Sequence, residues 1–300
     1  MCSRLPAGNT VYYMLQRRFG SLRQTPDPGP LLRACATLVS ELRAAGHEVA
    51  GARVMEVGTG RRIDIPLGFY LAGAASVITV DLNRYLRPEL VMASIRVLNE
   101  RLKDIAGLFE STTPREAVEQ RLERLIACQS LADVFATTNI SYLAPADAQR
   151  TSIASGSIDI QTSYTVFEHI PRSVLVGILK ETSRLLSKRG VALHHVDLSD
   201  HFAHDDRSIS YINFLQFSQG KWNRLAGNRF AYHNRLRADD YRRIYSDAGH
   251  DVLAWKESRD QRSLDLLKNG FPLDPAYQGI NPQELATCVI RILSKAPAGS

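Results

Sequence analysis

Short apolar runs alternate along the chain with segments of helical periodicity. The β-rich runs cover residues 53–57, 76–81, 140–143, 158–164, 191–196, 251–255 and 286–294. Apolar residues recur every three or four positions from Leu31 to Leu42, and the same spacing marks residues 172–187 and 238–248. Strands that alternate with helices are typical of an α/β protein. The pattern therefore predicts a doubly wound, mostly parallel sheet of seven strands.

Two long segments interrupt this alternation. Residues 84–138, between the second and third strands, have helical periodicity, and we expect a helical insertion that serves as a lid or a dimerisation element. In it, Thr113 has the position of an N-cap, with Glu116 three residues later. Residues 198–236 follow the fifth strand, where loops at carboxyl strand ends meet ligands, so substrate contacts are expected there.

Turn-forming residues divide the N-terminus from the rest of the chain. Residues 25–30 are a cluster of proline, glycine and aspartate, so residues 1–30 are predicted to be an arm. Residues 31–300 are then a single domain. No stretch has the apolar length of a membrane span or the apolar core of a signal peptide, and a cytoplasmic location is expected.

Composition narrows the function classes. The 300 residues are 44% hydrophobic and 23% charged, which is ordinary for a globular protein. The net charge of +6 is spread in short, interrupted basic stretches, so a nucleic-acid partner is disfavoured. The 4 cysteines lie far apart without metal-ligand spacing and are interpreted as reduced thiols.

A glycine turn follows the first predicted strand. Gly58 and Gly60 come directly after residues 53–57 and allow backbone N–H groups to approach a ligand. Asp81, at the end of the next strand, is placed to accept hydrogen bonds from ribose hydroxyls. A dinucleotide site would carry a further glycine where this chain has Ile63, so NAD is disfavoured. A plain tight turn and a helix N-cap at Asp81 are the alternatives.

Taken in order, several segments resemble the motifs of class I S-adenosylmethionine-dependent methyltransferases. The matching segments are residues 56–60, 80–83, 145–148, 157–160, 166–170 and 179–190. The resemblance implies the seven-stranded methyltransferase sheet and S-adenosyl-L-methionine as the cofactor. The cofactor contacts that it implies are Glu56, Gly58, Thr59, Gly60, Asp81, Leu82, Asp147, Ala148, Tyr164 and Glu168. The chain departs from the family pattern at Arg61-Arg62.

Two of these acids have structural alternatives. Glu56 can complement the ammonium group of the cofactor, or it can form a salt bridge with Arg53 or Arg61. Asp147 is either a contact of the adenine amino group, as the resemblance implies, or a turn residue.

Methyl transfer needs an aligned nucleophile and, for many acceptors, a base that removes its proton. The candidate bases are His169 after the fourth strand and His195, Asp197 and His201 around the end of the fifth. Strand alternation places His195 and Asp197 on one face and His194 on the other. Alternatively these polar groups cap the strand and order the next loop. No fixed metal-ligand spacing is present, so catalysis without a metal is preferred.

The sequence therefore predicts a methyltransferase acting on an oxygen or nitrogen of a small hydroxylated acceptor, such as a sugar or secondary metabolite. The candidates for recognising an anionic or hydroxylated acceptor are Arg229, His233, Asn234 and Arg235. A homo-oligomer formed through the helical insertion is possible on this interpretation. The alternatives are a non-catalytic, cofactor-binding partner subunit and an RNA methyltransferase.

Overall fold

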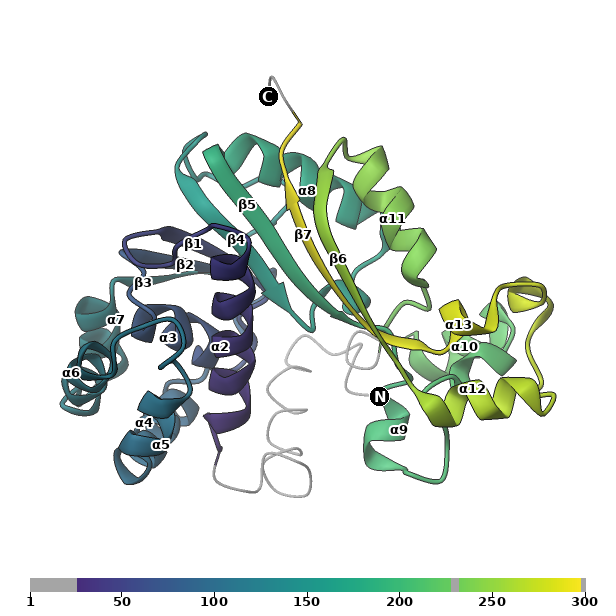
Figure 1. Cartoon of the computed structure of the whole chain (residues 1–300), viewed down its shortest axis with the longest axis horizontal. Coiled ribbons are helices and arrows are strands. Elements are labelled where there is room, and N and C mark those ends of the chain that lie inside the picture. Colours follow the sequence, from purple (N-terminus) through teal and green to yellow (C-terminus); the bar gives the residue numbers. More distant parts are fainter. Residues whose placement is uncertain (1–25, 228–231, 298–300) are drawn as a thin grey trace. The chain divides into compact units, whose positions relative to one another are not determined.

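The described part of the chain contains a seven-stranded sheet with the order β3-β2-β1-β4-β5-β7-β6 (Figure 1). The computed structural model describes residues 26–227 and 232–297. The strands are β1 (Arg53–Val57), β2 (Ser76–Val80), β3 (Ile140–Leu143), β4 (Ile158–Tyr164), β5 (Leu186–Asp197), β6 (Asp251–Arg259) and β7 (Thr287–Lys295). β1 pairs in parallel with β2 and β4, β2 pairs in parallel with β3, and β6 is antiparallel to β7. The predicted doubly wound, mostly parallel sheet is confirmed.

Helices fill the connections between these strands. They are α2 (Gly29–Ala44), α3 (Asp64–Leu71), α4 (Pro88–Glu100), α5 (Leu102–Gly107), α6 (Arg115–Ile126), α7 (Leu131–Thr138), α8 (Arg172–Leu185), α9 (Phe202–Asp205), α10 (Gln219–Ala226), α11 (Ala238–Asp247), α12 (Gln261–Lys268) and α13 (Pro282–Leu285). Short 3₁₀ turns are η3 (Phe167–His169), η4 (Asn213–Gln216) and η5 (Pro275–Tyr277). Among the described residues, no helix combines the length and apolar character needed to cross a membrane.

By their internal contacts, the described residues divide into two compact units. The first unit comprises residues 26–162 and 184–193, and the second comprises residues 163–183 and 194–297. The boundaries fall within β4, β5 and α8.

In the first unit, α2 packs closely on α3. The buried residues of α2 recur at helical spacing, and all eight residues of α3 are buried. Gly68 of α3 lies so close to Cys35 of α2 that a Cβ at Gly68 would stand 2.6 Å from the Cβ and Sγ atoms of Cys35. Val57, Val80 and Leu143 are register neighbours, so β1, β2 and β3 end at one edge. Parallel strands thus bring the loops that follow them together.

Between β2 and β3 the chain forms four helices, α4 to α7. α6 contacts α4, α5 and α7 (Figure 1). The predicted N-cap at Thr113 is wrong: α6 begins at Arg115, its N-cap position is Pro114, and no side chain caps it. Thr113 is instead buried.

In the second unit, an apolar cluster links α10, η4 and α13. Its buried members are Ile212, Phe214, Leu215, Trp222, Ala226 and Leu285. Phe217 packs against it from the surface side. Phe214 and Trp222 are therefore part of the core, whereas Phe217 is half-buried and Tyr211 is 37% exposed.

Candidate functional site

The glycine turn after β1 is tied directly to the carboxylate that follows β2. Gly58 and Gly60 have φ values of 91° and 67°, in the left-handed region that favours glycine. The Gly60 N–H donates to Oδ2 of Asp81 at 2.8 Å, and the Gly58 N–H donates to the carbonyl of Val80 at 2.8 Å. A Cβ placed on Gly60 would meet no atom within 4 Å, so the space beside this turn is open. Asp81 is not a helix N-cap, since α4 begins at Pro88.

Glu56 lies buried beneath the same edge. Its carboxylate accepts a hydrogen bond from the hydroxyl of Thr79, which in turn is hydrogen-bonded to Thr59. Burial raises the pKa of Glu56 to about 8, against the lowering effect of the Thr79 hydrogen bond. The expected alternative partner Arg53 pairs with Asp159 at 2.9 Å.

Two further acids near the edge also have raised pKa values. Burial raises the pKa of Asp81 to about 7, although the backbone N–H groups of Gly60 and Leu82 lower it. Burial likewise raises the pKa of Asp64 to about 6, and its ion pair with Arg62 at 3.0 Å opposes this shift. The buried carboxyl of Glu56, the half-buried carboxyl of Asp81 and the buried carboxyl of Asp64 at the start of α3 make a cradle that a cationic or hydroxyl-bearing ligand would stabilise.

The other expected cofactor contacts are less enclosed or lie in the second unit. Leu82 is 66% exposed, and Ala148 is half-buried. Asp147 is exposed and accepts from the backbone N–H of Gln149 at 2.9 Å, which is the turn role left open by the sequence. Tyr164 and Glu168 belong to the second unit.

In the second unit, a strained turn carries Glu168 and His169. Thr165, between β4 and η3, has a φ of 51°, which is costly for a β-branched residue. Glu168 is 1% exposed, and neither carboxylate oxygen has a hydrogen-bond partner of normal geometry among the described residues. Burial raises the pKa of Glu168 well above its ordinary value. Backbone N–H groups of Glu168 and Asp197 lie near enough to lower that pKa slightly.

The segment after α10 holds this turn in place. The Asn234 amide donates to the carbonyls of Phe167 and Ile170 at 3.0 and 2.9 Å, and its backbone N–H donates to the carbonyl of Glu168. Nδ1 of His169 lies 2.9 Å from the carbonyl oxygen of Tyr232. Asn234 therefore orders the η3 turn, and its amide is not free for acceptor recognition.

Arg235, the neighbouring acceptor candidate, also has a structural role. Its guanidinium donates to the carbonyls of Phe214 and Phe217 and, at 2.9 Å, to Oε1 of Gln219. Because the side chain is buried and its Nη1 and Nη2 groups are engaged by these oxygens, it holds the segment before α11 against η4 and the start of α10. Arg229 lies outside the described residues.

The candidate bases at the end of β5 form a histidine cluster. Oδ1 of Asp197 accepts from the N–H and hydroxyl of Ser199, while Oδ2 lies 3.8 Å from Nε2 of His201 and 3.5 Å from Nε2 of His204. Burial lowers the pKa of His201 to about 3; Asp197 opposes this, and the neighbouring imidazoles, His233 first, reinforce it. The His201 ring stacks on that of His233 at 4.7 Å.

The predicted alternation of the two β5 histidines is confirmed. His194 is fully buried, stacks on Phe167 and lies 2.8 Å from the hydroxyl of Ser163. His195 stacks instead on Tyr164 at 4.4 Å, and burial lowers its pKa to about 4. His195 is thus a neutral imidazole at physiological pH.

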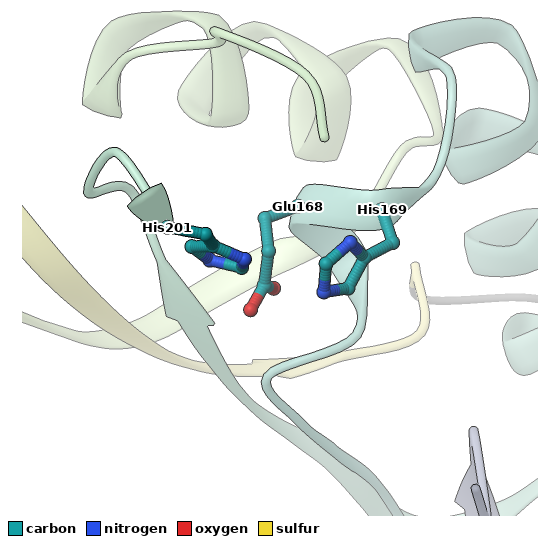
Figure 2. Close-up of side chains that lie close together, drawn as sticks. All are labelled: Glu168, His169 and His201. Carbon is teal, nitrogen blue, oxygen red and sulfur yellow. The ribbon is translucent and has the colours of Figure 1, made fainter. Parts of the chain in front are cut away.

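Tertiary structure also brings together residues that sequence reasoning did not combine. Glu168, His169 and His201 each offer a ligand atom, and these atoms lie within 4.8 Å of one another (Figure 2). Glu168 had been expected to contact the cofactor, and the two histidines to act as bases. A Glu-His pair and a distant histidine have no fixed sequence spacing, so no motif signalled the group.

A cavity of about 510 Å³ lies within the second unit. It is lined by Ala203, His204, Arg207, Ile209, Ser210, Tyr211, Asp260 and Arg262. Arg262 donates to the carbonyls of Arg207, Ser208 and Ile209, so it shapes the loop that borders the cavity. Most of the lining comes from the segment 198–236 that the sequence indicated for substrate contacts.

No protein-family profile and no curated protein matches the chain. Among solved structures, an S-adenosylmethionine-dependent methyltransferase from Mesorhizobium loti is 14% identical, with a TM-score of 0.45 over 85% of this chain and 95% of that one. Magnesium protoporphyrin IX methyltransferase from Synechocystis PCC 6803, solved with bound SAH, is 12% identical, with a TM-score of 0.49 over 97% and 96%. A [4+2]-cyclase is 12% identical, with a TM-score of 0.47 over 89% and 82%. Likeness at this level transfers no activity, so the functional conclusion must come from the residues of this chain.

Proposed function

We propose that this chain is an S-adenosylmethionine-dependent methyltransferase that acts on an oxygen or nitrogen of a small hydroxylated acceptor. The observation that carries the proposal is the hydrogen bond from Gly60 to Asp81, at a strand edge that also holds the buried carboxyl of Glu56. When bound, S-adenosylmethionine supplies a methyl group activated by its sulfonium centre.

The first unit has groups that fit each polar part of this cofactor. Oδ2 of Asp81 accepts from the Gly60 N–H, and a carboxylate has further lone pairs with which it can accept from a ribose hydroxyl. Glu56 complements the ammonium of the amino-acid end, and a cation there would favour the ionised carboxylate that burial alone disfavours. The open space beside Gly60 leaves room for a ligand against the backbone.

The second unit supplies the proposed acceptor pocket and the candidate bases. A cavity of about 510 Å³ has the size of a small-molecule site, and its lining mixes apolar, cationic and hydroxyl groups. His195 and Asp197 are the proposed proton acceptors, because a neutral imidazole and a carboxylate both have a lone pair for the proton. His169 and His201, the other two candidates named from the sequence, belong to the same unit.

Calorimetric titration tests the cofactor assignment first. The full chain is expected to bind S-adenosylmethionine and S-adenosylhomocysteine but not NAD. Asp81→Ala should weaken binding by about 1–3 kcal/mol, since a hydrogen bond to a charged group is lost. Asp104→Ala, which removes an exposed aspartate of the same unit, is the matched control and should bind as the parent does. Unchanged affinity in Asp81→Ala would refute the ribose contact.

Turnover separates this proposal from its alternatives. A methyltransferase forms S-adenosylhomocysteine when supplied with a suitable hydroxylated acceptor, whereas a partner subunit binds the cofactor without turnover. An RNA methyltransferase would instead bind RNA with a steep dependence on salt. The interrupted basic stretches and the small polar cavity favour the small-molecule acceptor.

A further inference from the structure

The geometry points to a second ligand site in this chain: Glu168, His169 and His201 bind a divalent transition-metal ion. One carboxylate and two imidazoles converge in the second unit, with a ligand atom from each within 4.8 Å of the others. Figure 2 shows the Glu168 carboxylate between the two imidazole rings. This site differs from the proposed cofactor cradle, whose residues belong to the first unit.

The buried carboxylate is the strongest sign of a missing cation. Both Glu168 oxygens are buried and lack a hydrogen-bond partner of normal geometry among the described residues. An isolated buried carboxylate is expensive, and buried charges are ordinarily paired or coordinate a metal. Nε2 of His201 is also without a hydrogen-bond partner there. Three potential ligands therefore lie together, and among the described residues neither the Glu168 carboxylate nor Nε2 of His201 has a hydrogen-bond partner of normal geometry.

The surrounding structure prepares His169 and Glu168 for this role. The carbonyl of Tyr232 faces Nδ1 of His169, so the proton is held on Nδ1 and the lone pair of Nε2 points away from that contact. Asn234 fixes the η3 turn through the carbonyls of Phe167 and Ile170. These hydrogen bonds orient the side chains of Glu168 and His169. In metal sites, hydrogen bonds to the ligating residues orient the ligands in the same manner.

The donor set selects the class of ion. Two imidazoles and one carboxylate suit zinc, iron and similar first-row ions, whereas magnesium and calcium prefer oxygen ligands. With bond lengths of about 2.0–2.2 Å, ligand atoms around a tetrahedral ion stand about 3.3–3.6 Å apart. Ligand atoms up to 4.8 Å apart must therefore draw together by roughly an ångström or slightly more. His169 is exposed and has room for that movement.

Three protein ligands leave at least one coordination position open. An oxygen atom of a small molecule can occupy such a position, and this part of the inference rests on the proposed function. Metal binding itself does not depend on the proposed function, because all three ligands are side chains of this chain and no cofactor takes part.

The test is titration of the full, metal-free chain with Co²⁺ and Zn²⁺ in the absence of S-adenosylmethionine. One equivalent of Co²⁺ should bind and give the visible bands of a nitrogen- and oxygen-ligated ion, and Zn²⁺ should displace it. Mg²⁺ should not compete. Because no cofactor is present, failure of metal binding and failure of methyl transfer are distinguishable.

Four variants locate the site. Glu168→Gln and His169→Gln should each weaken Co²⁺ binding at least tenfold and alter the spectrum of the bound ion. Because His169 is exposed, its replacement should leave the fold intact. His204→Gln removes the adjacent histidine that pairs with Asp197, and His47→Gln removes a histidine of the first unit; both should bind Co²⁺ as the parent does. The inference is overturned if the parent binds no stoichiometric Co²⁺, if Glu168→Gln and His169→Gln bind normally, or if His204→Gln weakens binding as much as they do.

Discussion

Replacing Glu56 with glutamine should stabilise the protein, and the gain should grow with pH. The folded-state pKa of Glu56 is about 8, against an ordinary value of 4.5, and the first cause is burial. The folded chain therefore retains this proton up to about pH 8, whereas the unfolded chain loses it near 4.5. Stability from the protonated carboxyl is fully present below 4.5 and is lost as pH rises through about 8. Glutamine keeps an acceptor for Thr79 and carries no such penalty.

The magnitude follows from the two pKa values. Each pKa unit corresponds to about 1.4 kcal/mol, so the interval from 4.5 to about 8 corresponds to about 5 kcal/mol when Glu56 is fully ionised. Relaxation and entry of water reduce such penalties, and we expect Glu56→Gln to gain roughly 2–5 kcal/mol at about pH 9 relative to its effect at about pH 4.5.

Urea unfolding of parent and variant at several pH values measures this difference. The control is Glu116→Gln, which changes an exposed carboxylate of α6 and should alter stability little at any pH. If Glu56→Gln changes the free energy of unfolding by the same amount at about pH 4.5 and about pH 9, the raised pKa of Glu56 in the folded chain is contradicted. Such a result would mean that Glu56 ionises in the folded chain as it does in the unfolded one.

Two further substitutions test the structural supports of the sites. Asn234→Ala should lower the free energy of unfolding by about 1–3 kcal/mol, since the carbonyls of Phe167 and Ile170 lose their donor; an unaltered urea midpoint would contradict this role. Gly68→Ala should cost about 1–3 kcal/mol or more, because its Cβ would overlap Cys35 and push α2 from α3, and pairing it with Cys35→Gly should recover part of the loss in thermal unfolding.

Local sequence carried the information for the first unit's site. Gly58, Gly60 and Asp81 were each predicted to contact one ligand, and the hydrogen bond from Gly60 to Asp81 shows that the turn and the acid are adjacent. The inference works because parallel strands end at one edge, so a residue directly after β1 must lie near a residue directly after β2. Strand alternation likewise placed His194 and His195 on opposite faces, as their different stacking partners show.

Local sequence failed where a side chain's partner is distant in the chain. Thr113 has the spacing of a capping box, but it is buried and α6 starts beyond it. Asn234 and Arg235 look like ligand-binding groups in a polar segment, yet backbone carbonyls engage both. A polar side chain forms hydrogen bonds with the backbone groups that lie beside it in the folded chain. The sequence does not show which loop will supply those groups.

Periodicity and strand polarity act over short distances along the chain. The sequence alone therefore predicted the alternation of strands and helices, the glycine turn after the first strand and the acid after the second. Tertiary structure was needed to bring Glu168 and His169 to His201, which lies more than thirty residues later. It also buries the Glu168 carboxylate with no hydrogen-bond partner of normal geometry among the described residues. Burial and loop packing decide such a cluster, and they depend on contacts across the whole second unit rather than on the spacing of residues along the chain.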